Sequence, residues 1–112
     1  MIIAKKFTFD SAHFLPNYVG KCKQIHGHTY TLEVLIEGEV NPDTGMVVDF
    51  AQIKHLVQSK VIEVLDHKLL NDVIPNPTAE NIALWIEKTI ASQFDNVLRL
   101  RLWETSDSYV EL

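Results

Sequence analysis

Three histidines in the first quarter of the chain have the types and spacing of metal ligands. His26 and His28 flank Gly27 and precede a run in which apolar residues alternate with polar ones. On a strand of period two this spacing places both imidazoles on the same face, and glycine between them lets the backbone bend toward an ion. Neutral imidazole is a common zinc ligand. A third ligand must come from elsewhere, and His13 ends an earlier run with the same alternation.

The alternative for these histidines is three unrelated side chains, either solvated or satisfied in a core. Two on one strand face and a third at the end of a neighbouring strand favour a shared metal instead. Three imidazoles without a fourth protein ligand are typical of catalytic zinc, whose open position takes water or substrate. We therefore expect Zn²⁺ bound by His13, His26 and His28.

Cys22 is the only cysteine, so no intramolecular disulfide is possible and a reducing compartment is expected. A free cysteine is most often a small buried hydrophobe. Here it stands in a polar loop between Lys21 and Lys23, where positive potential favours thiolate. We interpret Cys22 as a base or nucleophile.

Two further groups have both a structural and a chemical interpretation. Asp66 and His67 follow a predicted helix, where His67 could merely complement the helix dipole, or the pair could form a proton relay that tunes the thiol. Glu104 could be a charge at a strand end. Its carboxylate could also accept two parallel hydrogen bonds from the amidine-like edge of a heterocycle, as a pterin offers.

Composition limits the class of protein. The 112 residues fit one domain, 1–112, and 46% hydrophobic content with mean hydropathy near zero is ordinary for a globular chain. No apolar run approaches the ~20 residues needed to cross a bilayer, and the first residues do not resemble a secretion signal, so we expect a cytoplasmic protein. A net charge of −5 without a cluster of Lys or Arg argues against nucleic-acid binding but leaves a small anionic substrate possible.

The periodicities predict an α+β domain of order ββααββ. Strands are expected over 3–13, 28–40, 96–104 and 109–112, and helices over 50–65, capped by Asp49, and from Thr78 to Ile90, with loops at 14–25 and 66–77. The first helix should direct Phe50, Ile53, Val57, Val61, Val64 and Leu65 to the core. Two helices would cover one face of a four-stranded antiparallel sheet. The other face would carry polar groups such as Thr31, Glu33 and Arg101, and the two open edges predict a homo-oligomer joined through its sheets.

Together these motifs resemble the 6-pyruvoyl-tetrahydropterin synthase family. The resemblance rests on Ser-Ala-His ending at His13, Cys-x-x-x-His-Gly-His at 22–28, the stretch Leu65 to Asn71, Pro-Thr-Ala-Glu-Asn at 77–81, and Trp-Glu-Thr at 103–105. These stand in the family's order and span nearly the whole chain. The short gap between Cys22 and His26 is most similar to the bacterial 6-carboxy-5,6,7,8-tetrahydropterin synthases of queuosine biosynthesis.

The resemblance implies the tunnelling fold, in which subunits join their sheets into a barrel, two rings stack as a hexamer, and active sites lie at subunit interfaces. It implies 7,8-dihydroneopterin triphosphate as substrate, with zinc held by the three histidines. Cys22 would be the proton acceptor, and His67 with Asp66 the relay. Glu104 and Thr105 would anchor the pterin ring, and Thr78 and Glu80 would also bind substrate.

The expected products are 6-carboxy-5,6,7,8-tetrahydropterin, triphosphate and acetaldehyde. Two enzymatic alternatives remain, a pyruvoyl-forming synthase of the biopterin pathway and a folate-pathway variant that makes 6-hydroxymethyl-dihydropterin. A third alternative is a non-catalytic zinc-binding assembly domain. No G-x-G-x-x-G motif or P-loop signals a nucleotide or redox cofactor.

Overall fold

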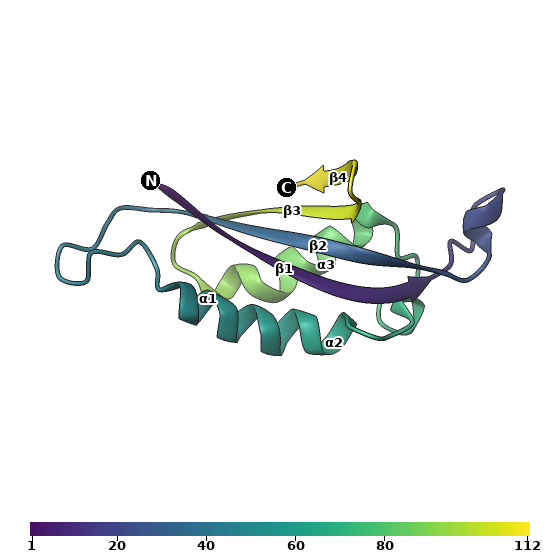
Figure 1. The fold of residues 1–112 in the computed structure, drawn as a ribbon, viewed down its shortest axis with the longest axis horizontal. Helices are drawn as coiled ribbons and strands as arrows, with labels where there is room; N and C mark the ends of the chain where they lie inside the picture. Colours follow the sequence, from purple (N-terminus) through teal and green to yellow (C-terminus); the bar gives the residue numbers. More distant parts are fainter.

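A computed structural model describes residues 1–112, in which a twisted antiparallel sheet lies over two helices (Figure 1). The strands are β1 (Ile2–His13), β2 (His26–Glu37), β3 (Val97–Thr105) and β4 (Ser108–Glu111), and they lie side by side in the order β1-β2-β3-β4. The predicted α+β class, the four-stranded antiparallel sheet and the helices on one face are confirmed. The second strand begins two residues earlier than expected, because His26 already pairs with His13, and it ends earlier, at Glu37.

Alternation along the strands separates the two faces of the sheet. Phe7 and Phe9 on β1, and Tyr30 and Leu32 on β2, are buried against the helices. Twenty buried apolar residues form one continuous core between the two layers. The opposite face is open and polar, as predicted.

Glu33 differs from its neighbours on the open face because its side chain is buried. Arg101 Nη1 lies 3.1 Å from one carboxylate oxygen, and Lys6 Nζ lies 3.9 Å from the other. These two cations come from the strands on either side of β2 and cover the carboxylate.

The segment predicted as one helix over 50–65 is continuous but changes its winding. It consists of α1 (Phe50–Val57), a π-helical stretch (Gln58–Ile62) and α2 (Glu63–Leu65). The buried residues Ile53, Val57, Val61 and Leu65 recur at intervals of four. This spacing exceeds the 3.6 residues of an α-helical turn, and the wider π-helical turn keeps the apolar side directed at the sheet.

The prediction that Phe50 and Val64 of this helix lie in the core is wrong. Phe50 is 51% exposed and Val64 is 37% exposed, whereas Ile62, which was not expected in the core, is buried. The wider winding of the π-helical stretch places Ile62, its last residue, on the buried side, and Val64, which follows the stretch, on the exposed side. Phe50 is the first residue of α1, at the helix end.

The second helix, α3 (Ala79–Ile90), is capped by Thr78 as predicted. The Thr78 hydroxyl accepts a hydrogen bond from the backbone N–H of Asn81, which caps the helix. Ile82, Ala83, Ile86 and Ile90 form its buried side. Short 3₁₀ turns at Lys21–Lys23, Leu70–Asp72 and Ala91–Gln93 lie in the connecting segments. No helix is both long enough and apolar enough to span a bilayer.

Candidate metal centre and relay

Strand pairing brings the three histidines together at one end of the sheet. His13 is the last residue of β1 and pairs directly with His26, the first residue of β2, while His28 follows two positions later on the same face. The ring centroids are 4.6 to 5.1 Å apart, and one ring nitrogen from each histidine lies within 4.8 Å of the others. His13 is buried and the other two are partly buried. The structure thus brings all three predicted ligands to one point.

Backbone carbonyl groups fix which nitrogen of two rings is free. His13 Nδ1 lies 2.8 Å from the carbonyl oxygen of Pro77, and His26 Nδ1 lies 2.7 Å from that of Gln24. A carbonyl can only accept, so each Nδ1 carries the proton and each neutral ring keeps a lone pair on Nε2. Such hydrogen bonds are typical of the outer shell of metal-binding histidines.

The two free nitrogens face each other, with 3.0 Å between His13 Nε2 and His26 Nε2. Two lone pairs at this distance repel unless a proton or a cation lies between them. Together with the third imidazole, this donor set fits a metal ion with N-ligand preference. The sequence could not predict that the carbonyls of Pro77 and Gln24 bind these histidines, because every residue carries a carbonyl group.

Glu104 lies two residues after the buried Leu102, on the face of the sheet that carries this cluster, and it stands at a β-bulge. Trp103 pairs with Tyr109 and Thr105 pairs with Ser108, so Glu104 is the extra residue on β3. Bulges redirect side chains beside functional sites. Glu104 Oε1 lies 4.0 Å from His28 Nε2. The carboxylate therefore lies beside the histidine cluster, and its role as a pterin anchor stays a prediction.

Electrostatics favour the neutral form of His28, the form that can bind a metal. Burial lowers the pKa of His28, Glu104 opposes this shift by raising it, and the neighbouring His13 and His26 lower it further. The net direction favours neutral imidazole. Beneath the cluster, burial raises the pKa of the Tyr30 phenol, and its oxygen lies 3.3 Å from His13 Nδ1.

Asp66 and His67 form a hydrogen-bonded pair beside β1. Asp66 Oδ2 lies 3.0 Å from His67 Nδ1, and Asp66 Oδ1 accepts from the backbone N–H of Asp10 at 2.9 Å. The Asp10 hydrogen bond is the main reason that the pKa of Asp66 is lowered, with His67 adding to it. His67 adopts a left-handed backbone with φ of 56°, an uncommon conformation for a side-chain-bearing residue that often marks function.

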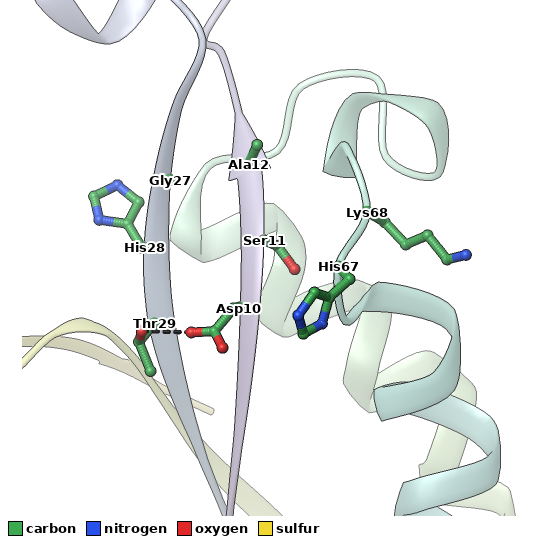
Figure 2. A pocket seen from close by; sticks show the side chains of 8 residues that line it. All are labelled: Asp10, Ser11, Ala12, Gly27, His28, Thr29, His67 and Lys68. Carbon is green, nitrogen blue, oxygen red and sulfur yellow. Dashed lines mark hydrogen bonds between the residues drawn. The ribbon is translucent and has the colours of Figure 1, made fainter.

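A pocket of about 540 Å³ lies beside β1 and β2 next to His67, and of the three histidines His28 alone is among its lining residues (Figure 2). His67 lines it from beside the outer edge of β1, whereas the ring of His28 points away from His67, on the other side of β2. The remaining lining residues are Asp10, Ser11, Ala12, Gly27, Thr29 and Lys68. The pocket is open to solvent and could admit a small polar molecule.

The other predicted site residues lie elsewhere in the chain. Cys22, partly buried in the 3₁₀ turn of the 14–25 loop, belongs neither to the histidine cluster nor to the lining of this pocket. Thr105 Oγ1 donates to Asp107 at 2.8 Å in the β3–β4 turn. Thr78 caps α3, and Glu80 is exposed in its first turn. A single chain therefore brings His13, His26 and His28 together with Glu104, and pairs Asp66 with His67, but it does not bring Cys22 to either group.

These features define a class of α+β protein in which three sheet histidines converge beside a carboxylate and an Asp-His pair lies along the outer edge of β1. The sequence model of the 6-pyruvoyl tetrahydropterin synthase family matches residues 2–112, and the chain belongs to this family.

Relatives with curated names match this chain over nearly its full length and nearly the full length of their own chains. A dihydroneopterin monophosphate aldolase of Pyrococcus furiosus is 41% identical over 98% of this chain and 95% of its own. A 6-carboxy-5,6,7,8-tetrahydropterin synthase of Haemophilus influenzae is 32% identical over 97% of this chain and 96% of its own. The solved 6-pyruvoyl tetrahydropterin synthase of Caenorhabditis elegans superposes with a TM-score of 0.89 at 28% identity, covering 100% of this chain and 94% of that one. These relatives support a lyase activity of the tetrahydropterin synthase type.

Proposed function

We propose that this protein is a zinc-dependent lyase that converts 7,8-dihydroneopterin triphosphate to 6-carboxy-5,6,7,8-tetrahydropterin, with release of triphosphate and acetaldehyde, as in queuosine biosynthesis. The observation that carries the proposal is the pair of unprotonated Nε2 atoms of His13 and His26, which lie 3.0 Å apart and close to His28, whose Nε2 is 4.0 Å from Glu104. A relative of 32% identity carries the name of this synthase, which supports the choice of product.

The three histidines would hold the metal through their free nitrogens. When bound, zinc would supply Lewis-acid polarisation of the hydroxyl groups on the substrate side chain, which makes the adjacent C–H protons more acidic. Glu104 would accept two hydrogen bonds from the amidine-like edge of the pterin and so orient the side chain toward the cluster. Its position 4.0 Å from His28 supports this role.

Proton transfer would fall to Cys22 and the Asp66-His67 pair. The Cys22 thiolate would take a carbon-bound proton. His67 Nδ1 is occupied by Asp66, so its Nε2 is the nitrogen that would exchange a proton with the substrate or the thiol. Thr105, Thr78 and Glu80 remain proposed substrate contacts, although in one chain Thr78 already caps α3 and Thr105 bonds to Asp107.

Because Cys22 is outside the pocket of His67, we propose that the complete site forms between subunits of a cytoplasmic homo-oligomer. The tunnelling fold provides such an arrangement, with sheets joined edge to edge into a barrel and two rings stacked into a hexamer. Backbone groups of Ala4, Lys6 and Thr8 on the outer edge of β1, which have no partner within the chain, support this proposal.

One observation favours a second candidate reaction. The Pyrococcus furiosus relative, at 41% identity, is named for aldol cleavage of dihydroneopterin monophosphate. Breaking the bond between the first two side-chain carbons would give 6-hydroxymethyl-dihydropterin and a phosphorylated two-carbon aldehyde. The same metal site could serve this cleavage, since it also requires a polarised hydroxyl group and a proton acceptor.

Product analysis distinguishes the candidates. The zinc-loaded protein is incubated separately with dihydroneopterin triphosphate and monophosphate, and the pterins and aldehydes are identified by mass spectrometry. Acetaldehyde with 6-carboxy-tetrahydropterin supports the proposal, 6-hydroxymethyl-dihydropterin supports the aldolase, and a pyruvoyl product supports the biopterin branch. Metal binding without turnover of either substrate would leave a non-catalytic assembly domain, and His26→Ala is the metal-free control.

A further inference from the structure

The segment 66–71, which we call the edge segment, pairs with the outer edge of β1 over the stretch that ends in the site. The backbone N–H of Asp10 donates to the Asp66 carboxylate, and its carbonyl accepts from the N–H of His67 at 2.6 Å. Two residues later, the N–H of Ala12 donates to the carbonyl of Lys68 at 3.0 Å. Asp10 and Ala12 direct their backbone groups outward, as alternate residues of an edge strand do.

Asn71 completes this pairing with its side chain instead of its backbone. Asn71 Oδ1 accepts from the N–H of Phe14 at 3.0 Å, and Asn71 Nδ2 donates to the carbonyl of Phe14 at 2.9 Å. The amide thus binds both backbone groups of Phe14, as a paired strand residue would. Asn71 is partly buried, and both of its hydrogen bonds go to this one residue.

Phe14 immediately follows the metal ligand His13, at the point where pairing between β1 and β2 ends. His13 pairs with His26 in the last row of the ladder, so no β2 residue restrains the chain beyond it. The next link is the N–H of Leu15, which donates to the carbonyl of Cys22 at 2.8 Å. Asn71 is therefore the group that fixes the backbone between the final ladder pair and the Cys22 loop.

The His13 ring and its backbone are restrained separately. The carbonyl of Pro77 restrains the ring through Nδ1, whereas Asn71 restrains the backbone one residue later. If the Asn71 amide were lost, two backbone groups of Phe14 would lack protein partners, and the end of β1 could fray. A displaced His13 backbone would carry Nε2 away from His26 Nε2.

From this geometry we propose that Asn71 is a positioning residue for the metal site, acting on His13 through Phe14. The inference rests on the proposed metal role of the histidine cluster. The Leu65–Asn71 stretch would then have two roles. Its first half presents His67, and its last residue, Asn71, fixes the position of the metal ligand His13.

The test compares metal affinity with fold stability. Zn²⁺ and Co²⁺ affinities of Asn71→Ala are measured by competition with a chromophoric chelator, the visible Co²⁺ spectrum is recorded, and thermal unfolding is followed in the metal-free state. Loss of an outer partner typically weakens metal binding ~10- to 100-fold, so we expect a Zn²⁺ Kd at least about tenfold higher and an altered Co²⁺ spectrum. Val57→Ala, a core truncation in α1 chosen as a destabilised control, should keep the wild-type affinity and spectrum.

Asn71→Asp is a conservative variant for which we expect an intermediate metal affinity. The carboxylate still accepts from the Phe14 N–H but cannot donate to its carbonyl, so its affinity should fall between wild type and Asn71→Ala. Wild-type affinity and spectrum in both Asn71 variants would overturn this inference alone. If the wild-type protein bound neither metal, the proposed metal site would fall, and this inference with it.

Discussion

The ring nitrogen that each histidine leaves free determines what the cluster can bind. In His13 and His26 the choice is made by the carbonyls of Pro77 and Gln24, which hold the proton on Nδ1. The sequence correctly predicted that the three histidines lie close together, because strand periodicity and side-chain type are visible in it. It could not predict the tautomers, since a backbone acceptor has no side-chain signature and Pro77 is distant in sequence.

Replacement of Cys22 separates proton transfer from binding. Cys22→Ala should keep the wild-type metal content, because the thiol lies outside the histidine cluster, yet lose ~10²–10⁴-fold in turnover if the thiolate is the general base. Cys22→Ser should recover little, since a hydroxyl ionises far less readily than a thiol. His67→Ala should impair the same step, and the two losses should not add. Steady-state kinetics with metal analysis checks this, and activity of Cys22→Ala within a few-fold of wild type would assign the base to another group.

Replacement of Glu104 tests the anchoring role that its position suggests. Glu104→Gln keeps the shape but removes the charge, and charge-assisted hydrogen bonds contribute about 1.5–3 kcal/mol, so KM should rise roughly 10- to 100-fold. Glu111→Gln, which changes an exposed carboxylate paired with Arg101 on the open face, is the matched control and should leave KM near wild type. An unchanged KM in Glu104→Gln would remove the carboxylate from substrate binding.

At the scale of elements, hydrophobic periodicity predicted the strands and both helices, but two local irregularities escaped it. The interval of four between Ile53, Val57, Val61 and Leu65 was compatible with an ordinary helix, so the π-helical stretch was missed. The bulge at Glu104 was also missed, because it depends on how the short β4 pairs with β3. Both irregularities arise from packing between elements, which a sequence pattern does not encode.

Thr78 has a structural role at the start of α3 that can be measured by itself. Its hydroxyl caps the helix through the N–H of Asn81, so Thr78→Ala should lower the free energy of unfolding by about 0.5–2 kcal/mol. Thr78→Ser keeps the hydroxyl and should remain near wild type. Chemical denaturation of the metal-free protein measures both variants, and equal stability of Thr78→Ala and wild type would refute the cap.

At the scale of the whole molecule, the sheet leaves part of one edge unpaired. The edge segment covers β1 only near the site, so Ala4, Lys6 and Thr8 direct their backbone groups outward without partners. On the opposite edge, Leu100 and Leu112 exchange both backbone hydrogen bonds, which turns the backbone groups of Tyr109 and Glu111 outward. The sequence predicted open edges, but only the structure shows which stretch of β1 remains free.

The directions of β1 and β4, and the faces on which their side chains lie, favour pairing between the β1 edge of one copy and the β4 edge of another. β1 and β4 run in opposite directions within one sheet, so β4 of a second copy that continued the alternation would pair antiparallel to β1. The residues with outward backbone groups on both edges also have their side chains on the open face. Pairing them would therefore continue the polar face and the helix-covered face without interruption, as an oligomeric barrel requires.

Proline at an outward position tests this assembly. Ala4→Pro removes an N–H that has no partner within the chain, and an isolated edge strand tolerates proline at such a position. If copies pair through this edge, Ala4→Pro should lower the molecular mass in sedimentation velocity at micromolar concentration while the circular dichroism spectrum stays native. Lys5→Pro is the matched control, because by strand alternation its N–H faces β2, and its loss should unfold the subunit. Proline in a paired edge removes an intersubunit hydrogen bond and crowds the neighbouring strand. An Ala4→Pro protein with the mass of a wild-type oligomer would therefore exclude this stretch of β1 from the interface. A monomeric wild-type protein would exclude the assembly itself.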